Sequence, residues 1–158
     1  LNKSFSPSLR CGYVISTAGS EVWQALIQAK EVLGGSLPLA VQVATAKFFE
    51  SGGFRRYVAR ARREYRHRRS LLIETLAAQG LAANLTGLDG GLHAILRMPA
   101  GRTGTEVAAA LAARDVLVEA IAEFTQLDRA DDAIAIGYGA EPVTRLTRGL
   151  EEVVRVVG

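Results

Sequence analysis

Two residues near the start of the chain have the chemistry to hold a small molecule: Lys3 and, seven residues later, Arg10. A lysine amine condenses with an aldehyde to form a Schiff base. An arginine guanidinium holds a phosphate through two parallel hydrogen bonds. Small hydroxyl residues between them, starting with Ser4, leave room for a ligand and supply further donors. These groups suit pyridoxal 5'-phosphate (PLP), which carries both an aldehyde and a phosphate, whereas the alternative is an ordinary solvated loop.

The order of residues around this pair narrows the interpretation. The segment 3–13, Lys-Ser-Phe-Ser-Pro-Ser-Leu-Arg-Cys-Gly-Tyr, resembles the lysine loop of fold-type I aminotransferases, in the form used by the MocR branch of GntR-family transcriptional regulators. Further segments, at 48–69, 90–93 and 134–139, are similar to later motifs of that branch and follow in the same order. The resemblance therefore extends over the whole chain.

This resemblance implies an α/β fold, the C-terminal part of a fold-type I PLP-dependent transferase. Residues 1–80 would form the helical end of the PLP-binding large domain together with the interdomain helix. Residues 81–158 would form a small C-terminal α+β domain with the element order ββαββα. The resemblance also implies that PLP is held as an aldimine on Lys3, that Arg10 is a phosphate ligand, and that Ser4 contacts the cofactor.

Two functions are compatible with this resemblance. The first is the effector-sensing part of a PLP-dependent transcriptional regulator, in which PLP or a small amino compound is the effector. The alternative is a class I/II aminotransferase, in which Lys3 is the catalytic proton shuttle. Aminotransferases commonly place an arginine in the last small-domain strand for the substrate carboxylate, where this chain has Ala135. This difference favours the sensor, unless Arg97 or Arg102 takes that role.

The resemblance also implies partners. The family forms homodimers with the cofactor site at the subunit interface, and the MocR branch contacts DNA through a preceding winged-helix domain absent from this chain. Another departure is Asn2, where the branch usually has serine. We expect a cytoplasmic protein without a membrane segment. We interpret the sequence as a piece of a longer chain that is inactive when isolated.

Composition sets independent limits. The chain has 158 residues, of which 49% are apolar and 22% charged, so it can bury a core and is not disordered. Cys11 is the single cysteine, which excludes a disulfide scaffold. The two histidines, His67 and His93, are too few and too far apart for a metal site, so no metal is expected.

The basic residues are concentrated in one segment. Residues 54–69 contain eight arginines and one acid, Glu64, whereas the remainder of the chain has 11 Lys and Arg against 15 Asp and Glu. Such a cluster neutralises phosphates when it binds nucleic acid. The alternative is a solvated helix that packs on acidic neighbours, and the resemblance makes it an interdomain helix.

The apolar periodicity and the turn residues predict the elements that position these groups. Helices are expected at 21–33, 37–50, 54–78, 105–114 and 142–156. Strands are expected at 11–15, 82–85, 92–98, 116–118 and 133–139. The lysine segment thus precedes a helical region, and the arginine cluster lies on the longest helix.

Overall fold

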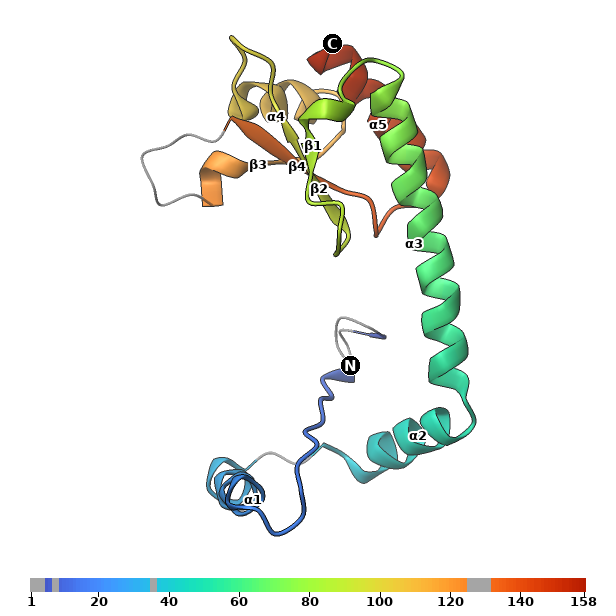
Figure 1. Ribbon diagram of the computed structural model, residues 1–158, viewed down its shortest axis with the longest axis vertical. Coiled ribbons are helices and arrows are strands. Elements are labelled where there is room, and N and C mark those ends of the chain that lie inside the picture. The colour runs from blue at the N-terminus through green and yellow to red at the C-terminus, as the bar shows by residue number, and fades with distance from the viewer. Residues whose placement is uncertain (1–4, 7–8, 35–36, 125–131) are drawn as a thin grey trace. The chain divides into compact units, whose positions relative to one another are not determined.

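The computed structural model describes residues 5–6, 9–34, 37–124 and 132–158 (Figure 1). The chain divides into two compact units, unit 1 with residues 1–61 and unit 2 with residues 62–158. Helix α3, Gly53–Ala77, begins in unit 1 and ends in unit 2. The division therefore falls within the helix that the resemblance makes an interdomain helix.

Unit 1 contains two further helices. Helix α1, Glu21–Leu33, begins where the Ser20 side chain accepts a hydrogen bond from the Trp23 amide, and it ends at Gly34, whose positive φ of 64° suits glycine. Helix α2, Leu39–Glu50, follows Pro38. Neither helix has a buried residue, so both expose apolar side chains.

The strand predicted at 11–15 is wrong. These residues adopt no regular secondary structure, and the side chains of Tyr13, Val14 and Ile15 are 66%, 70% and 87% exposed. A strand is stable only when a neighbour accepts its backbone hydrogen bonds. No strand of the described part of unit 1 lies beside this segment to do so.

Unit 2 has the predicted order ββαββα. Its elements are β1 (Leu85–Thr86), β2 (His93–Arg97), α4 (Gly104–Ala112), β3 (Glu119–Ala120), β4 (Ala133–Gly137) and α5 (Val143–Val157), with 3-10 turns at Ala82–Asn84 and Ile121–Phe124. The four strands form one antiparallel sheet in the order β1-β2-β4-β3. The α/β fold class and the element order of the small domain are confirmed.

One face of this sheet carries the core of unit 2. Ala94 and Leu96 of β2 and Ile134 and Ile136 of β4 point to that face and are at most 5% exposed. Helices cover them with Leu72 and Leu76 from α3, Val107 and Leu111 from α4, and Leu146, Leu150, Val153, Val156 and Val157 from α5. Unit 2 is therefore a two-layer α/β structure, and the opposite face of its sheet is less covered.

A capping box begins α4. The Thr103 hydroxyl accepts a hydrogen bond from the Glu106 amide, and the Glu106 carboxylate accepts one from the Thr103 amide. Among the described residues, no helix combines the length and the apolar character needed to cross a membrane.

Candidate functional site

The structure describes one of the three predicted cofactor residues. Lys3 and Ser4 lie outside the described residues, as does Asn2. Arg10 is described and exposed, and its backbone has a φ of 48°. This left-handed conformation costs a residue with a Cβ atom about 1–2 kcal/mol. Backbone strain of this kind is concentrated at functional sites, so it fits a ligand-binding role for Arg10.

The guanidinium of Arg10 makes no hydrogen bond or ion pair within the described part of the chain. Its planar set of donors can accommodate two oxygens of one anion. Arg10 therefore fits the phosphate ligand that the sequence predicts. A phosphate would supply acceptors that the described residues around Arg10 do not.

Phe5 anchors the lysine segment to the helices of unit 1. Its ring centroid lies 5.1 Å from that of Phe48 on α2 and 5.1 Å from that of Tyr57 on α3. The Tyr57 hydroxyl also donates a hydrogen bond of 3.3 Å to the carbonyl oxygen of Phe5. These contacts hold the backbone two residues after Lys3, so they would limit where the lysine amine can reach.

The turn between α2 and α3 needs glycine. Gly52 has a positive φ of 69°, and an added Cβ at Gly53 would lie 2.5 Å from Cδ2 of Phe48. The rings of Phe49 and Phe54 stack across this turn with centroids 4.5 Å apart. Gly53 thus lets the Phe48 ring take the position from which it contacts Phe5.

A hollow of about 380 Å³ lies between the lysine segment and α2. Its lining is almost entirely apolar and consists of Phe5, Leu9, Ala40, Val41, Ala44, Thr45, Phe48, Phe49 and Phe54. Such a lining offers no group that balances the charge of a phosphate. The hollow is therefore a packing surface beside the lysine segment and not itself an anion site.

The less covered face of the unit 2 sheet carries Ala135. Ala135 is half-buried and pairs with Ile95 of β2 and Glu119 of β3. Arg97 lies two residues after Ile95 and therefore on the same face. Arg102 donates to the carbonyl oxygen of Val156 near the end of α5. Arg97 and Arg102 are the two arginines that could bind a substrate carboxylate in place of one at position 135. Arg102 holds the end of α5. Arg97 lies on the same sheet face as Ala135.

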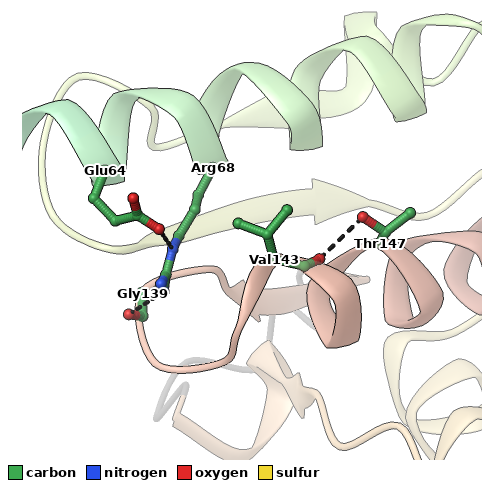
Figure 2. Close-up of polar contacts among 5 residues, drawn as sticks. All are labelled: Glu64, Arg68, Gly139, Val143 and Thr147. Atoms are coloured by element: carbon green, nitrogen blue, oxygen red, sulfur yellow. Dashed lines mark hydrogen bonds and ion pairs between the residues drawn. The ribbon is translucent and has the colours of Figure 1, made fainter.

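Arg68 connects α3 to the loop after β4, as Figure 2 shows. Its Nε lies 3.0 Å from Oε1 of Glu64, and its Nη1 donates a hydrogen bond of 2.7 Å to the carbonyl oxygen of Gly139. The Arg68 side chain is only 13% exposed. In the same loop, the buried Tyr138 donates from its hydroxyl to the carbonyl oxygen of Gly91 over 3.0 Å.

The contacts of Phe5 and Arg68 do not follow from the sequence. In the sequence Phe5 is one residue of the lysine motif, and Arg68 is an arginine that interrupts an apolar stripe. That interruption is the available signal, because an arginine on a buried stripe needs partners for its charge. The partner Gly139 is 71 residues away, so no local pattern indicates it.

The curated proteins that this chain resembles are transcriptional regulators. No protein-family model matches the chain. The chain is 32% identical over 148 residues to the HTH-type pyridoxine biosynthesis transcriptional regulator PdxR of Corynebacterium glutamicum, covering 94% of this chain and 32% of that protein. It is 24% identical over 152 residues to the uncharacterized HTH-type transcriptional regulator YhdI of Bacillus subtilis, covering 96% of this chain and 32% of that protein. The chain thus spans about a third of the length of these curated relatives.

Solved structures resemble the chain over nearly all of its length. An archaeal alanine:glyoxylate aminotransferase has a TM-score of 0.78 at 19% identity, covering 99% of this chain and 38% of the other. The α-aminoadipate aminotransferase LysN of Thermus thermophilus, solved with N-(5'-phosphopyridoxyl)-L-leucine, has a TM-score of 0.76 at 20% identity, covering 98% and 39%. At these identities the likeness shows the fold.

Proposed function

We propose that the chain is the aminotransferase-like part of a MocR-type transcriptional regulator and that it senses an effector through PLP. The observation that carries the proposal is a pairing of two findings. The relatives matched over at least 94% of the chain are HTH-type regulators, while the fold is that of aminotransferases. An aminotransferase fold within a regulator fits a binding role for its cofactor site.

Three residues would hold the cofactor in this proposal. PLP supplies an aldehyde for capture by an amine, and an electron sink for bond breaking at the captured compound. The Lys3 amine would be its covalent anchor, Arg10 would hold its phosphate, and Ser4 would donate a hydrogen bond beside them. The guanidinium of Arg10, which has no partner among the described residues, and its strained backbone support this assignment, as does the anchoring of the segment at Phe5.

Effector binding would change the domain geometry of the regulator. An amino compound that competes with Lys3 for the cofactor, or PLP itself, shifts a conformational equilibrium only if it binds one conformation more tightly than the other. In the proposed homodimer, a preceding winged-helix domain would carry that shift to DNA. The names of the relatives support the DNA-binding part of this proposal.

Amino-acid transamination is the second candidate, and the aminotransferase fold favours it. The residue at position 135 weighs against it, because alanine offers no charge for a substrate carboxylate. Arg97, on the same sheet face, is the residue that an aminotransferase would need for that carboxylate. Product formation from an amino acid and a keto acid, lost in Arg97→Gln, would favour the enzyme over the regulator.

Absorbance spectroscopy of the full-length protein tests the proposed function. We expect added PLP to give the visible absorbance of a lysine-bound cofactor, and Lys3→Ala to abolish it. The matched control is Lys47→Ala, which removes a lysine from the last turn of α2 and should leave the absorbance unchanged. Retention of the absorbance in Lys3→Ala would eliminate Lys3 as the anchor.

A further inference from the structure

The second half of α3 presents an arginine surface that the PLP site does not use. We define it as Arg62, Arg63, Arg66 and Arg69, all within unit 2. The first three are exposed and Arg69 is half-buried. Unlike the charges of a typical protein surface, these four have no acid interspersed among them except Glu64.

Glu64 does not neutralise this surface. Its carboxylate pairs with Arg68, whose guanidinium also binds the carbonyl oxygen of Gly139. None of the four surface arginines forms an ion pair with any described residue, and Arg66 donates only to the backbone carbonyl of Arg62. Four positive charges are therefore uncompensated within the described part of the chain.

Helical geometry aligns these charges. Arg62, Arg66 and Arg69 stand at positions i, i+4 and i+7, so they share one stripe of the helix. At about 1.5 Å of rise per residue, this stripe spans about 10 Å along the axis. Arg63 lies beside it. Leu72 and Leu76, further along α3, point into the core of unit 2, and by the same spacing they lie on the side of the helix that Arg69 occupies. Arg62, Arg63 and Arg66 therefore precede the buried part of α3 along the chain and stay exposed.

The chemistry of this surface fits a row of phosphates. All four residues are arginines, whose guanidinium groups bind phosphate oxygens in pairs. Each strand of duplex DNA carries one negative charge per about 3.4 Å of the helix axis, so a stripe of about 10 Å along one strand faces about three phosphates. An acidic protein presents carboxylates at spacings that no repeated pattern fixes. The length and the composition of the stripe therefore favour DNA.

We propose that the arginine surface of α3 binds the phosphate backbone of double-stranded DNA, so that the aminotransferase-like part adds its own contact to the complex. This inference rests on the proposed function, which makes the chain part of a DNA-bound regulator. Contacts to phosphates position a protein on DNA without reading sequence. The surface would strengthen binding to every sequence and leave the choice of operator to other residues.

The test measures the binding of full-length protein to a fluorescently labelled DNA duplex of mixed sequence over a range of salt concentrations. The variant replaces Arg62, Arg63, Arg66 and Arg69 with glutamine. Each arginine that contacts a phosphate contributes about 0.9 to the slope of log affinity against log salt. We expect the slope to fall by about 2–4 and the affinity at low salt to fall about tenfold or more.

Two matched variants provide controls. Replacing the same four residues with lysine keeps their charge and should retain most of the salt slope. Arg145→Gln combined with Arg148→Gln removes two exposed charges from α5 and should leave the slope unchanged. Circular dichroism verifies that every variant is folded.

An unchanged slope in the glutamine variant would overturn the proposal. A shift in oligomeric state with an unchanged slope would overturn it too, because the surface would then bind an acidic protein face. The salt slope and the PLP absorbance test the arginine surface and the proposed function separately. Protein without lysine-bound absorbance but with a reduced slope in the glutamine variant would refute the PLP site alone.

Discussion

At the scale of single residues, the account depends on what Lys3 and Arg10 can reach. Their spacing is compatible with PLP or with an ordinary solvated loop, and the resemblance of segment 3–13 to the lysine loop of fold-type I aminotransferases favours PLP. The structure adds that Arg10 is strained and unpaired within the described residues. The sequence could not predict that strain, because an arginine has no intrinsic preference for a left-handed backbone.

The first prediction concerns Arg10. Arg10→Ala in the full-length protein should weaken PLP binding about 10- to 100-fold, because hydrogen bonds to charged groups contribute about 1.5–3 kcal/mol. Arg60→Ala removes another exposed arginine, from α3, and should change the dissociation constant less than about threefold. Titration with PLP, followed by absorbance, measures both. Equal losses in the two variants would count against Arg10 as the phosphate ligand.

A second prediction concerns Arg68, whose half-buried side chain connects α3 to the loop after β4. Arg68→Ala should lower the free energy of unfolding by about 1–3 kcal/mol, since it leaves the Gly139 carbonyl oxygen without its donor. Urea unfolding provides the measurement. The control is Arg145→Ala, whose pair with Glu141 is exposed on both sides and should contribute less than about 1 kcal/mol. A loss no larger than the control's would show that this connection does not stabilise unit 2.

At the scale of elements, the sequence predicts a helix or a strand best where turn residues and short apolar runs mark it locally. The order ββαββα follows from turn residues and short apolar runs, and it is confirmed. Strand bounds are less predictable, because pairing decides them. The apolar run 116–118 predicts a strand, yet β3 forms at Glu119 and Ala120, which pair with Ala135 and Ile134.

The turn between α2 and α3 gives a prediction at this scale. Gly53→Ala should lower the free energy of unfolding by about 1–3 kcal/mol, since the added methyl group overlaps the Phe48 ring. PLP affinity should fall as well, because Phe48 contacts Phe5 in the lysine segment. Gly90→Ala is the control, as it lies outside the lysine loop and a Cβ there meets nothing within 4 Å. Unchanged urea unfolding and PLP affinity in Gly53→Ala would show that this turn does not position the segment.

At the scale of the whole molecule, the two units differ in how much apolar surface they bury. Unit 2 has a continuous core from its sheet and three helices, whereas α1 and α2 of unit 1 have no buried residue. Composition predicts that a chain of this length can form a core, but it does not predict where the core lies. Apolar helices without buried residues indicate a surface that further structure covers.

This difference predicts the pattern of amide hydrogen exchange. In the isolated 158-residue chain, amides of α4 and α5 should exchange slowly, and those of α1 and α2 much faster, because few apolar contacts oppose their opening. In the full-length protein, α1 and α2 should gain protection. Mass spectrometry of peptides from both proteins measures this. Equal protection of α1 and α5 in the isolated chain would show that unit 1 is stable without further contacts.

The central claim is that Lys3 is the covalent anchor of PLP, and borohydride reduction tests it most directly. Reduction of the full-length protein with bound PLP fixes the cofactor to the amine that holds it, and peptide mass spectrometry then identifies that lysine. The account predicts a phosphopyridoxyl group on the peptide that contains Lys3 and none on those with Lys30 or Lys47. A phosphopyridoxyl group on another lysine, or on none, would contradict the account.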